Sequence, residues 1–320
     1  MQNMTVLGID GGGSKTSAAL VNIDGEVVAR AVGGSINYYS NPLRQTRSNL
    51  RQMLSAMQPH LQNDPPQSVF IGMSALNGPA GEQELHAFTD GFFPGARVGM
   101  DSDLYVALES MHHDGACAVA VCGTGSMIAG RTERGEIICR GGFGYLLGDE
   151  GSGYAISLEA VRTAVRAAQD VVPPTMLTEA ALSFFGAEDA DALIPRFYDP
   201  PIRRQDVAAF LPEVCRCAQA GDAAAAEILR RQADDFAETA AALLQKLPDD
   251  APLGLWGGVF CHVPQFTARF LSRFQARNAS VLEFPPQIGA VFAAWKQCGI
   301  ACTPARLERI RAALRKGGVV

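Results

Sequence analysis

The first part of the chain alternates short apolar segments with helical ones. Five apolar or β-branched segments bounded by turn residues predict strands, at residues 4–9, 16–21, 26–32, 69–73 and 97–100. Two segments with helical periodicity lie among them, at residues 43–57 and 82–90. With a short helix that starts at Asp103 after the last of these strands, the elements follow in the order βββαβαβα, so we predict an α/β domain over residues 1–112.

The second part of the chain opens with the same pattern. Three apolar segments separated by turns predict strands, at residues 116–121, 127–131 and 136–140. The pattern is then helical from residue 154 to residue 246, with breaks at prolines and glycines. Two short strands and three helices complete the chain, at residues 253–256 and 281–283 and at residues 263–275, 287–296 and 303–316. We predict a second α/β domain over residues 113–320 with a helical insertion. The last helix of this second domain can pack back on the first domain.

The composition is that of a globular protein with two cores. A chain of 320 residues is longer than one hydrophobic core usually serves, and 48% of its residues are hydrophobic. The net charge of −6 argues against nucleic acid as a partner. No segment has the length and hydropathy of a membrane helix, and the chain does not begin with a basic region followed by an apolar one. We therefore predict a cytoplasmic protein without a membrane partner.

The eight cysteines are scattered along the chain, and several lie within apolar segments. This is typical of buried free thiols in a reducing compartment. Cys215 and Cys217 are two residues apart on a predicted helix and so face different directions, while Cys298 and Cys302 have no matching second pair. The cysteines therefore do not predict a metal site.

A glycine turn follows the first predicted strand. Residues 7–16 read Leu-Gly-Ile-Asp-Gly-Gly-Gly-Ser-Lys-Thr. The three consecutive glycines carry no Cβ, so this backbone can adopt positive φ and its N–H groups can approach an anion closely. Ser14 and Thr16 add hydroxyl donors, and Asp10 supplies a hard oxygen that suits Mg²⁺. The turn therefore predicts a site for the phosphates of a nucleotide.

Two other interpretations of this turn are open. The turn nearly matches the P-loop pattern, because Gly8 and Gly13 have the required spacing, but Ser14 separates Gly13 from Lys15. A P-loop also opens a helix, whereas residues 16–21 are predicted to form a strand. The other alternative is a tight turn without a ligand, which glycine-rich sequences form frequently.

A second glycine turn occurs at the matching position of the second domain. Cys122-Gly123-Thr124-Gly125-Ser126 separates the first two predicted strands there. One such turn is weak evidence for a ligand, but two on matching hairpins can hold a polyphosphate from two sides. The polar loop over residues 33–42, with hydroxyls, amides and two tyrosines, is typical of a sugar-binding loop. The glycine-rich segment 141–153 carries two acids, and the turn Gly257-Gly258 leaves room for a flat ring.

Five motifs in order resemble those of the BadF/BadG/BcrA/BcrD ATPase family. They are Ile9-Asp10-Gly11-Gly12-Gly13-Ser14, Gly123-Thr124-Gly125-Ser126, Gly142 with Gly148-Asp149-Glu150-Gly151-Ser152-Gly153, Ala218-Gln219-Ala220-Gly221-Asp222, and Trp256-Gly257-Gly258-Val259. The resemblance covers nearly the whole chain and, within the family, is strongest to the N-acetylglucosamine and glucosamine kinases. It implies the actin-like ATPase (ribonuclease H-like) fold, in which two α/β domains built on a βββαβαβα core close over a cleft. It also implies ATP and Mg²⁺ as cofactors and an amino sugar as substrate. We further predict a homodimer.

The resemblance also implies roles for single residues. Asp103 matches the catalytic base of the family, and Asp10 matches the acid associated with Mg²⁺. The residues that match phosphate- and nucleoside-binding positions are Gly11, Gly12, Gly13, Ser14, Lys15, Gly123, Thr124, Gly125, Gly221, Gly257 and Gly258. The residues that match sugar-binding positions are Ser35, Asn37, Asp103, Gly142 and Asp149. Asp101 lies two residues before Asp103, and in an extended segment the two would share a face, so geometry alone leaves the choice of base open; the match places it at Asp103.

The function that the resemblance implies is transfer of the γ-phosphate of ATP to the 6-hydroxyl of N-acetylglucosamine or glucosamine. The residues do not decide between these sugars, because the choice depends on pocket shape around one nitrogen substituent. Two other classes stay open. Some ATPases of this family activate dehydratases or reductases by electron transfer through an iron–sulfur cluster, which needs grouped cysteines. A regulator that binds nucleotide or sugar without catalysis is the other.

Overall fold

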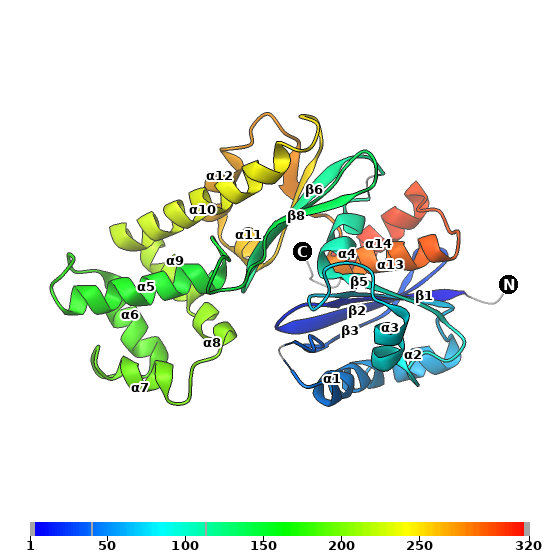
Figure 1. The fold of residues 1–320 in the computed structure, drawn as a ribbon, viewed down its shortest axis with the longest axis horizontal. Coiled ribbons are helices and arrows are strands. Elements are labelled where there is room, and N and C mark those ends of the chain that lie inside the picture. Colours follow the sequence, from blue (N-terminus) through cyan, green and yellow to red (C-terminus); the bar gives the residue numbers. More distant parts are fainter. Residues whose placement is uncertain (1–3, 40, 113, 317–320) are drawn as a thin grey trace. The chain divides into compact units, whose positions relative to one another are not determined.

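The computed structural model describes residues 4–39, 41–112 and 114–316. The chain forms two compact α/β units, each with one five-stranded sheet (Figure 1). Unit 1 comprises residues 1–114 and 282–320, and unit 2 comprises residues 115–281. The predicted α/β class is confirmed.

Unit 1 follows the predicted βββαβαβα order except that two helices, not one, separate its third and fourth strands. Its strands are β1 (Thr5–Gly11), β2 (Lys15–Asn22), β3 (Val27–Gly34), β4 (Ser68–Met73) and β5 (Arg97–Ser102). Its helices are α1 (Leu43–Ser55), α2 (Gln58–Asn63), α3 (Glu82–Thr89), α4 (Asp103–Ser110), α13 (Pro286–Gln297) and α14 (Pro304–Lys316). The strand order in the sheet is β3-β2-β1-β4-β5, with β1, β4 and β5 parallel. The carboxyl ends of these three strands therefore meet at one edge of the sheet.

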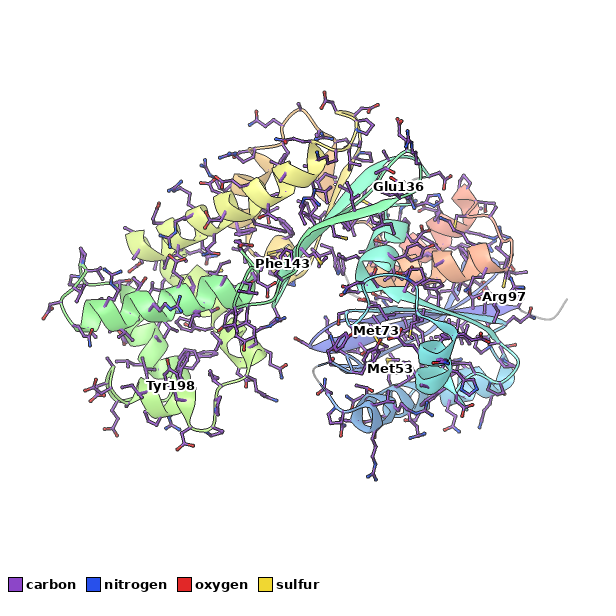
Figure 2. The ribbon with its side chains drawn as sticks, viewed as in Figure 1. Met53, Met73, Arg97, Glu136, Phe143 and Tyr198 are labelled. Atoms are coloured by element: carbon purple, nitrogen blue, oxygen red, sulfur yellow. The ribbon has the colours of Figure 1, made fainter. Side chains whose placement is uncertain are left out.

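Alternate residues of β1 pack into different layers. Leu7 and Ile9 belong to a buried cluster with residues of α1, among them Met53, and with Met73 of β4 (Figure 2). Val6 belongs to the cluster on the other face, with residues of α13 and α4. Because side chains alternate along a strand, Asp10 extends from the α4 and α13 face of the sheet.

Unit 2 repeats the sheet of unit 1. Its strands are β6 (Cys117–Cys122), β7 (Ser126–Arg131), β8 (Ile137–Gly141), β9 (Leu253–Trp256) and β10 (Ala279–Val281). The strand order β8-β7-β6-β9-β10 corresponds position by position to β3-β2-β1-β4-β5 of unit 1. In each unit the first two strands are antiparallel and the first pairs in parallel with the fourth. The predicted duplication is therefore present in the topology.

The predicted helical insertion lies between β8 and β9. Its helices are α5 (Gly153–Ala168), α6 (Met176–Phe185), α7 (Leu193–Tyr198), α8 (Arg204–Ala208), α9 (Leu211–Gln219) and α10 (Ala223–Leu244), and α11 (Gly258–His262) and α12 (Pro264–Leu271) follow β9. Residues of α5, α6, α9 and α10 share one hydrophobic core with β6 and β9. Among the described residues, no helix combines the length and the apolar character needed to cross a membrane.

The C-terminal part of the chain belongs to unit 1 and not to unit 2, so the boundary differs from the predicted one. The sequence predicts one domain over residues 113–320 whose last helix can pack back on the first domain, whereas both α13 and α14 belong to unit 1. Two glycines allow this close packing: a Cβ at Gly8 of β1 would lie 2.3 Å from the Gln287 carbonyl oxygen, and one at Gly289 would lie 1.9 Å from that of Val106. Residues far apart in sequence thus form one layer, which local periodicity does not reveal.

Candidate active site

Three carboxylates follow the parallel strands of unit 1. Asp10 stands near the end of β1, Asp101 stands near the end of β5, and Asp103 opens α4. In the strand register Asp10 pairs with Gly72 of β4, and Gly72 pairs with Asp101. Gly72 leaves room here for α4, because a Cβ at this position would lie 2.3 Å from Val106 Cγ2. The sheet therefore gathers acids at the start of one helix.

Asp10 and Asp103 act on each other electrostatically. Burial and the nearby charge of Asp103 together raise the pKa of Asp10 to about 7, against the charge of Lys15, which lowers it. Burial also raises the pKa of Asp103 to about 6, against the backbone N–H groups at the start of α4, which favour the carboxylate. A pair of half-buried carboxylates with raised pKa values is typical of a functional site.

Asp101 has a different environment from Asp103. Its side chain is only 7% exposed, and one carboxylate oxygen accepts the Ser102 backbone N–H at 2.6 Å. Ser102 in turn caps α4 by accepting the Tyr105 N–H. Asp101 thus supports the turn between β5 and α4, whereas Asp103 is less buried and lies beside Asp10. This difference supports Asp103 as the base, which stays a prediction.

The first glycine turn joins β1 to β2, as predicted, but its glycines do not use the positive φ that is open to them, and the expectation that Thr16 donates to a ligand is wrong. None of Gly11, Gly12 and Gly13 has a positive φ in the structure. Their lack of a Cβ leaves space instead: nothing lies within 4 Å of a Cβ placed at Gly13, and Gly11 packs against Ile36. Thr16 is fully buried and donates its hydroxyl to the Gly34 carbonyl at 2.8 Å, so it supports the β2–β3 pair and is no donor for a ligand.

The other predicted residues of this turn are exposed. Ser14 and Lys15 both lie at the surface, and Lys15 begins β2 opposite Gly34. Lys15 is close enough to Asp10 for its charge to lower the pKa of that carboxyl. The structure therefore places Asp10, Lys15 and Asp103 together in unit 1.

The predicted sugar loop is hydrogen-bonded to the glycine turn. Ser35 donates its hydroxyl to the Gly12 carbonyl oxygen at 3.1 Å and accepts the Asn37 N–H at 3.2 Å. Asn37 is 7% exposed; its Oδ1 accepts the Tyr39 N–H at 2.9 Å, and its Nδ2 donates to Ser74 Oγ at 2.9 Å. Ser74 also donates its N–H to the Gly11 carbonyl oxygen, so it joins the loop and the turn.

The second glycine turn joins β6 to β7 in unit 2. It is closed by a hydrogen bond of 2.8 Å from the Gly123 N–H to the Gly125 carbonyl oxygen, and Thr124 stands at its tip. Asp149 packs on this turn: a Cβ at Gly125 would lie 3.0 Å from both of its carboxylate oxygens. The Ser126 N–H donates to Asp149 Oδ1 at 3.1 Å. The turn and the predicted sugar ligand Asp149 therefore form one structure.

Asp149 is buried and strained. It is 4% exposed and has a φ of 66°, a left-handed conformation that is uncommon for a residue other than glycine. Burial raises the pKa of its carboxyl, against the Ser126 N–H and the charge of Arg204. Arg204 Nη1 lies 3.4 Å from Asp149 Oδ2, and its guanidinium lies over the Tyr145 ring. Strain at a buried acid supports a functional role for Asp149.

Gly257 and Gly258 lie beside the second turn, because β9 pairs with β6 and brings Trp256 opposite Val121. Gly257 has a φ of 108°, and a Cβ there would lie 2.2 Å from the Cys122 carbonyl oxygen. Gly221 also has a positive φ, 94°, and separates α9 from α10. Gly257 and Gly221 are therefore required by their backbone conformation, whatever ligand role they have.

Gly142 also has a positive φ, 74°, and packs against Met127, the residue after Ser126. Among the predicted residues of unit 2, the structure thus brings Gly123, Thr124, Gly125, Asp149 and Gly257 together and places Gly142 next to the start of β7. No described contact joins Gly221 to them.

The acids of unit 1 suit a magnesium ion that is shared with a phosphate ligand. Mg²⁺ is usually held by one or two carboxylates together with waters and phosphate oxygens. Asp10 supplies one such carboxylate, and the neighbouring charge of Asp103, which helps to raise the pKa of Asp10, is a repulsion that a cation would relieve. Within the described parts of the chain, no three His, Cys, Asp or Glu side chains are grouped so that they could hold a metal ion. The donor set therefore fits Mg²⁺ bound with phosphate and not in a protein cage.

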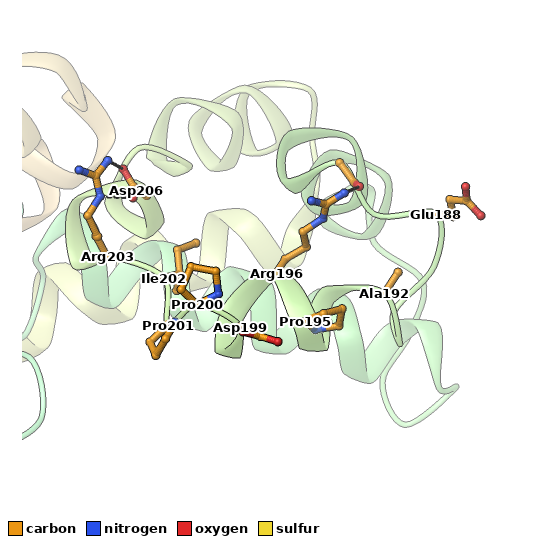
Figure 3. A pocket seen from close by; sticks show the side chains of 11 residues that line it. Glu188, Ala192, Pro195, Arg196, Asp199, Pro200, Pro201, Ile202, Arg203 and Asp206 are labelled. Carbon is orange, nitrogen blue, oxygen red and sulfur yellow. Dashed lines mark hydrogen bonds and ion pairs between the residues drawn. The ribbon is translucent and has the colours of Figure 1, made fainter.

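A hollow of about 740 Å³ lies elsewhere in unit 2, around α7 and the start of α8 (Figure 3). None of the predicted site residues lines it. Its arginines already have partners: Arg196 donates to the Gly186 carbonyl oxygen, and Arg203 forms an ion pair with Asp206. The hollow does not belong to the candidate site.

Sequence reasoning missed two residues of the site. Ser74 follows β4, and its position after a buried parallel strand could have indicated it. Arg204 lies 55 residues from Asp149 in a helix of five residues, and no local signal connects the two.

Two sheets of the same strand order, each with a glycine turn between its first two strands, define an actin-like ATPase fold of the sugar-kinase type. A model of the BadF/BadG/BcrA/BcrD ATPase family matches residues 7–294, and the chain belongs to this family. The N-acetyl-D-glucosamine kinase of Dictyostelium discoideum is 29% identical over 274 residues, 81% of this chain and 86% of the relative. The glucosamine kinase GspK of Vibrio cholerae serotype O1 is 29% identical over 238 residues, 72% of this chain and 77% of the relative.

A solved structure from Chromobacterium violaceum, described provisionally as an N-acetylglucosamine kinase, superposes with a TM-score of 0.77 at 25% identity. The match covers 91% of this chain and 99% of that chain. The predicted family and fold are therefore confirmed.

Gly13 offers a direct test of the first turn. Gly13→Val is expected to lower the affinity for ATP with little change in thermal stability, because its Cβ meets no protein atom within 4 Å and would meet only a ligand. Gly81→Val is the control, since Gly81 also has open space and stands before α3. Calorimetric titration with ATP measures the effect; equal affinities of the two folded variants would show that the turn does not bind phosphate.

Proposed function

We propose that this chain is an ATP- and Mg²⁺-dependent amino-sugar kinase that phosphorylates the 6-hydroxyl of N-acetylglucosamine or glucosamine. The observation that carries the proposal is the pair Asp10 and Asp103, two interacting carboxylates at the ends of parallel strands beside a glycine turn. Phosphoryl transfer needs little covalent help from a protein; it needs a positioned nucleophile and stabilised charge.

In this proposal Asp103 accepts the proton of the sugar 6-hydroxyl. A base works best when its pKa lies near the working pH, and the raised pKa of Asp103, about 6, meets this condition better than that of an exposed aspartate. Asp10 would hold Mg²⁺, which supplies positive charge for the phosphate oxygens. Ser35, Asn37, Gly142 and Asp149 would contact the sugar.

The glycine turns would bind the nucleotide. Backbone N–H groups of Gly11–Ser14 and of Gly123–Gly125 would contact phosphates, and Lys15 would add a modest positive charge. Gly221, Gly257 and Gly258 would border the nucleoside, where the absence of side chains admits a flat ring. A homodimer and a cytoplasmic location stay predictions.

A coupled assay of ADP release tests the proposal. We expect ADP release to depend on an amino sugar, with N-acetylglucosamine or glucosamine preferred over glucose, mannose and galactose, and to stop when EDTA removes the metal. Release of ADP without any sugar would favour an ATPase of the activator class. Binding of ATP and sugar without release would favour a regulator.

A further inference from the structure

The segment Asp149–Gly151 is hydrogen-bonded to both sides of the second glycine turn. On one side, the Cys122 thiol donates to the Gly151 carbonyl oxygen at 3.2 Å. On the other, Ser126 donates its N–H to Asp149 and its hydroxyl to the Glu150 carbonyl oxygen, at 3.1 and 2.6 Å. The position of this segment therefore sets the position of the Asp149 carboxylate over the turn.

Helix α10 holds the same segment from the opposite direction. Gly151 has a φ of 77°, and a Cβ there would lie 2.8 Å from Phe236 Cβ and 2.9 Å from the Gln232 carbonyl oxygen. The Gly151 N–H donates to Gln232 Oε1 at 2.8 Å. Gln232 therefore holds Gly151, and with it the segment, against α10 through this hydrogen bond.

Glu159 of α5 orients the Gln232 amide. Gln232 Nε2 donates to Glu159 Oε2 at 2.8 Å, and Glu159 also forms an ion pair with Arg231. An ionised carboxylate only accepts hydrogen bonds, so it requires the NH₂ side of the amide. The carbonyl side then faces Gly151. Without Glu159 the amide could turn over and present a donor to the Gly151 N–H.

We propose that Gln232 and Glu159 are positioning residues for the sugar site: Glu159 orients Gln232, and Gln232 holds Gly151 so that Asp149 is set for a sugar hydroxyl. This inference rests on the proposed kinase function and extends it to two side chains on α10 and α5 that do not touch the substrate. A hydrogen-bonded pair of this kind can be tested by exchanging its donor and its acceptor.

The test uses the full-length protein in three variants. Gln232→Glu places two carboxylates side by side, and Glu159→Leu removes the acceptor that orients the amide, whereas the double variant, Glu159→Gln with Gln232→Glu, exchanges the donor and the acceptor. Each single variant is expected to raise the KM for the amino sugar roughly 2- to 12-fold, the range for one net hydrogen bond, with a smaller change in kcat. The double variant places a donor at 159 and an acceptor at 232, so its KM is expected to return to within about 2-fold of wild type.

Two controls separate positioning from general damage. Gln245→Glu makes the same substitution at the exposed C-cap of α10 and is expected to leave the KM unchanged. Hydrogen exchange at Gly151 gives a readout that does not need activity: protection is expected to fall in Gln232→Leu and to stay in the double variant.

The outcomes distinguish the two proposals. If the wild type phosphorylates amino sugars but the single variants keep its KM, or the double variant is as poor as the singles, the positioning role is overturned and the kinase function stands. If the wild type phosphorylates no amino sugar, the proposed function is overturned, and the sugar-positioning role falls with it.

Discussion

Asp103→Asn is expected to lower kcat by roughly 10²–10⁴-fold, the usual contribution of a general base, while ATP and sugar still bind. Asparagine keeps the shape of the side chain but cannot accept the proton. Asp103 opens α4 next to Asp10, and its raised pKa follows from burial, so its carboxylate is held where a hydroxyl proton could be taken. Steady-state kinetics with both substrates, together with binding of each to the inactive variant, measures the effect.

Asp101→Asn is the matched comparison for that variant. Asp101 is almost fully buried and accepts the Ser102 N–H, and an asparagine Oδ1 can accept the same hydrogen bond. We therefore expect a much smaller loss of kcat than for Asp103→Asn. If Asp101→Asn proved the more damaging of the two, the base would be Asp101 and the motif match would be two residues out of register.

Asp10→Asn is expected to reduce kcat by roughly a hundredfold or more, since a metal ion that neutralises phosphate charge contributes several kcal/mol. The same variant is expected to be more stable than the wild type at pH 8 without metal. Burial and Asp103 raise the pKa of Asp10 from 3.8 to about 7 in the folded protein, so folding favours the protonated acid. The stability that the wild type gains from protonating Asp10 is fully present below about pH 4 and is lost as the pH rises to about 7.

Thermal unfolding in EDTA between pH 5 and pH 8 tests this second effect. The melting temperature of Asp10→Asn is expected to exceed that of the wild type by an amount that grows with pH, at roughly 2–4 °C for each kcal/mol relieved. Asp90→Asn is the control, because Asp90 is an exposed carboxylate at the end of α3. A melting temperature of Asp10→Asn below that of the wild type at pH 8 would contradict the role of Asp10 as a crowded, buried acid.

The sequence alone determined the local elements and their order. Apart from α2, which was not predicted, the strands, turns and helices of unit 1 occur where hydrophobic periodicity placed them, because period and turn chemistry are properties of neighbouring residues. The repeat of a glycine turn after Ile9-Asp10 and after Cys122 also showed that the two sheets are related, and the strand orders agree. The five glycine-rich motifs were sufficient to identify the family to which the chain belongs.

Only the tertiary structure decided what surrounds the candidate residues. Register across β1, β4 and β5 places Asp10 and Asp101 on either side of Gly72, and no local pattern contains that register. Thr16 had the residue type of a ligand donor, yet β-sheet packing uses its hydroxyl. The glycines of the first turn provide space and not positive φ, which depends on how β1 and β2 meet.

The same holds for the segments that join distant parts of the chain. Residues 282–320 return to unit 1 because Gly8 and Gly289 let α13 approach β1 and α4 closely. Asp149 depends on Arg204, 55 residues away, and its segment depends on Gln232, which lies 81 residues from Gly151. Contacts over such separations depend on the packing of whole helices, so a reading of neighbouring residues could predict the candidate acid but not the side chains that hold it.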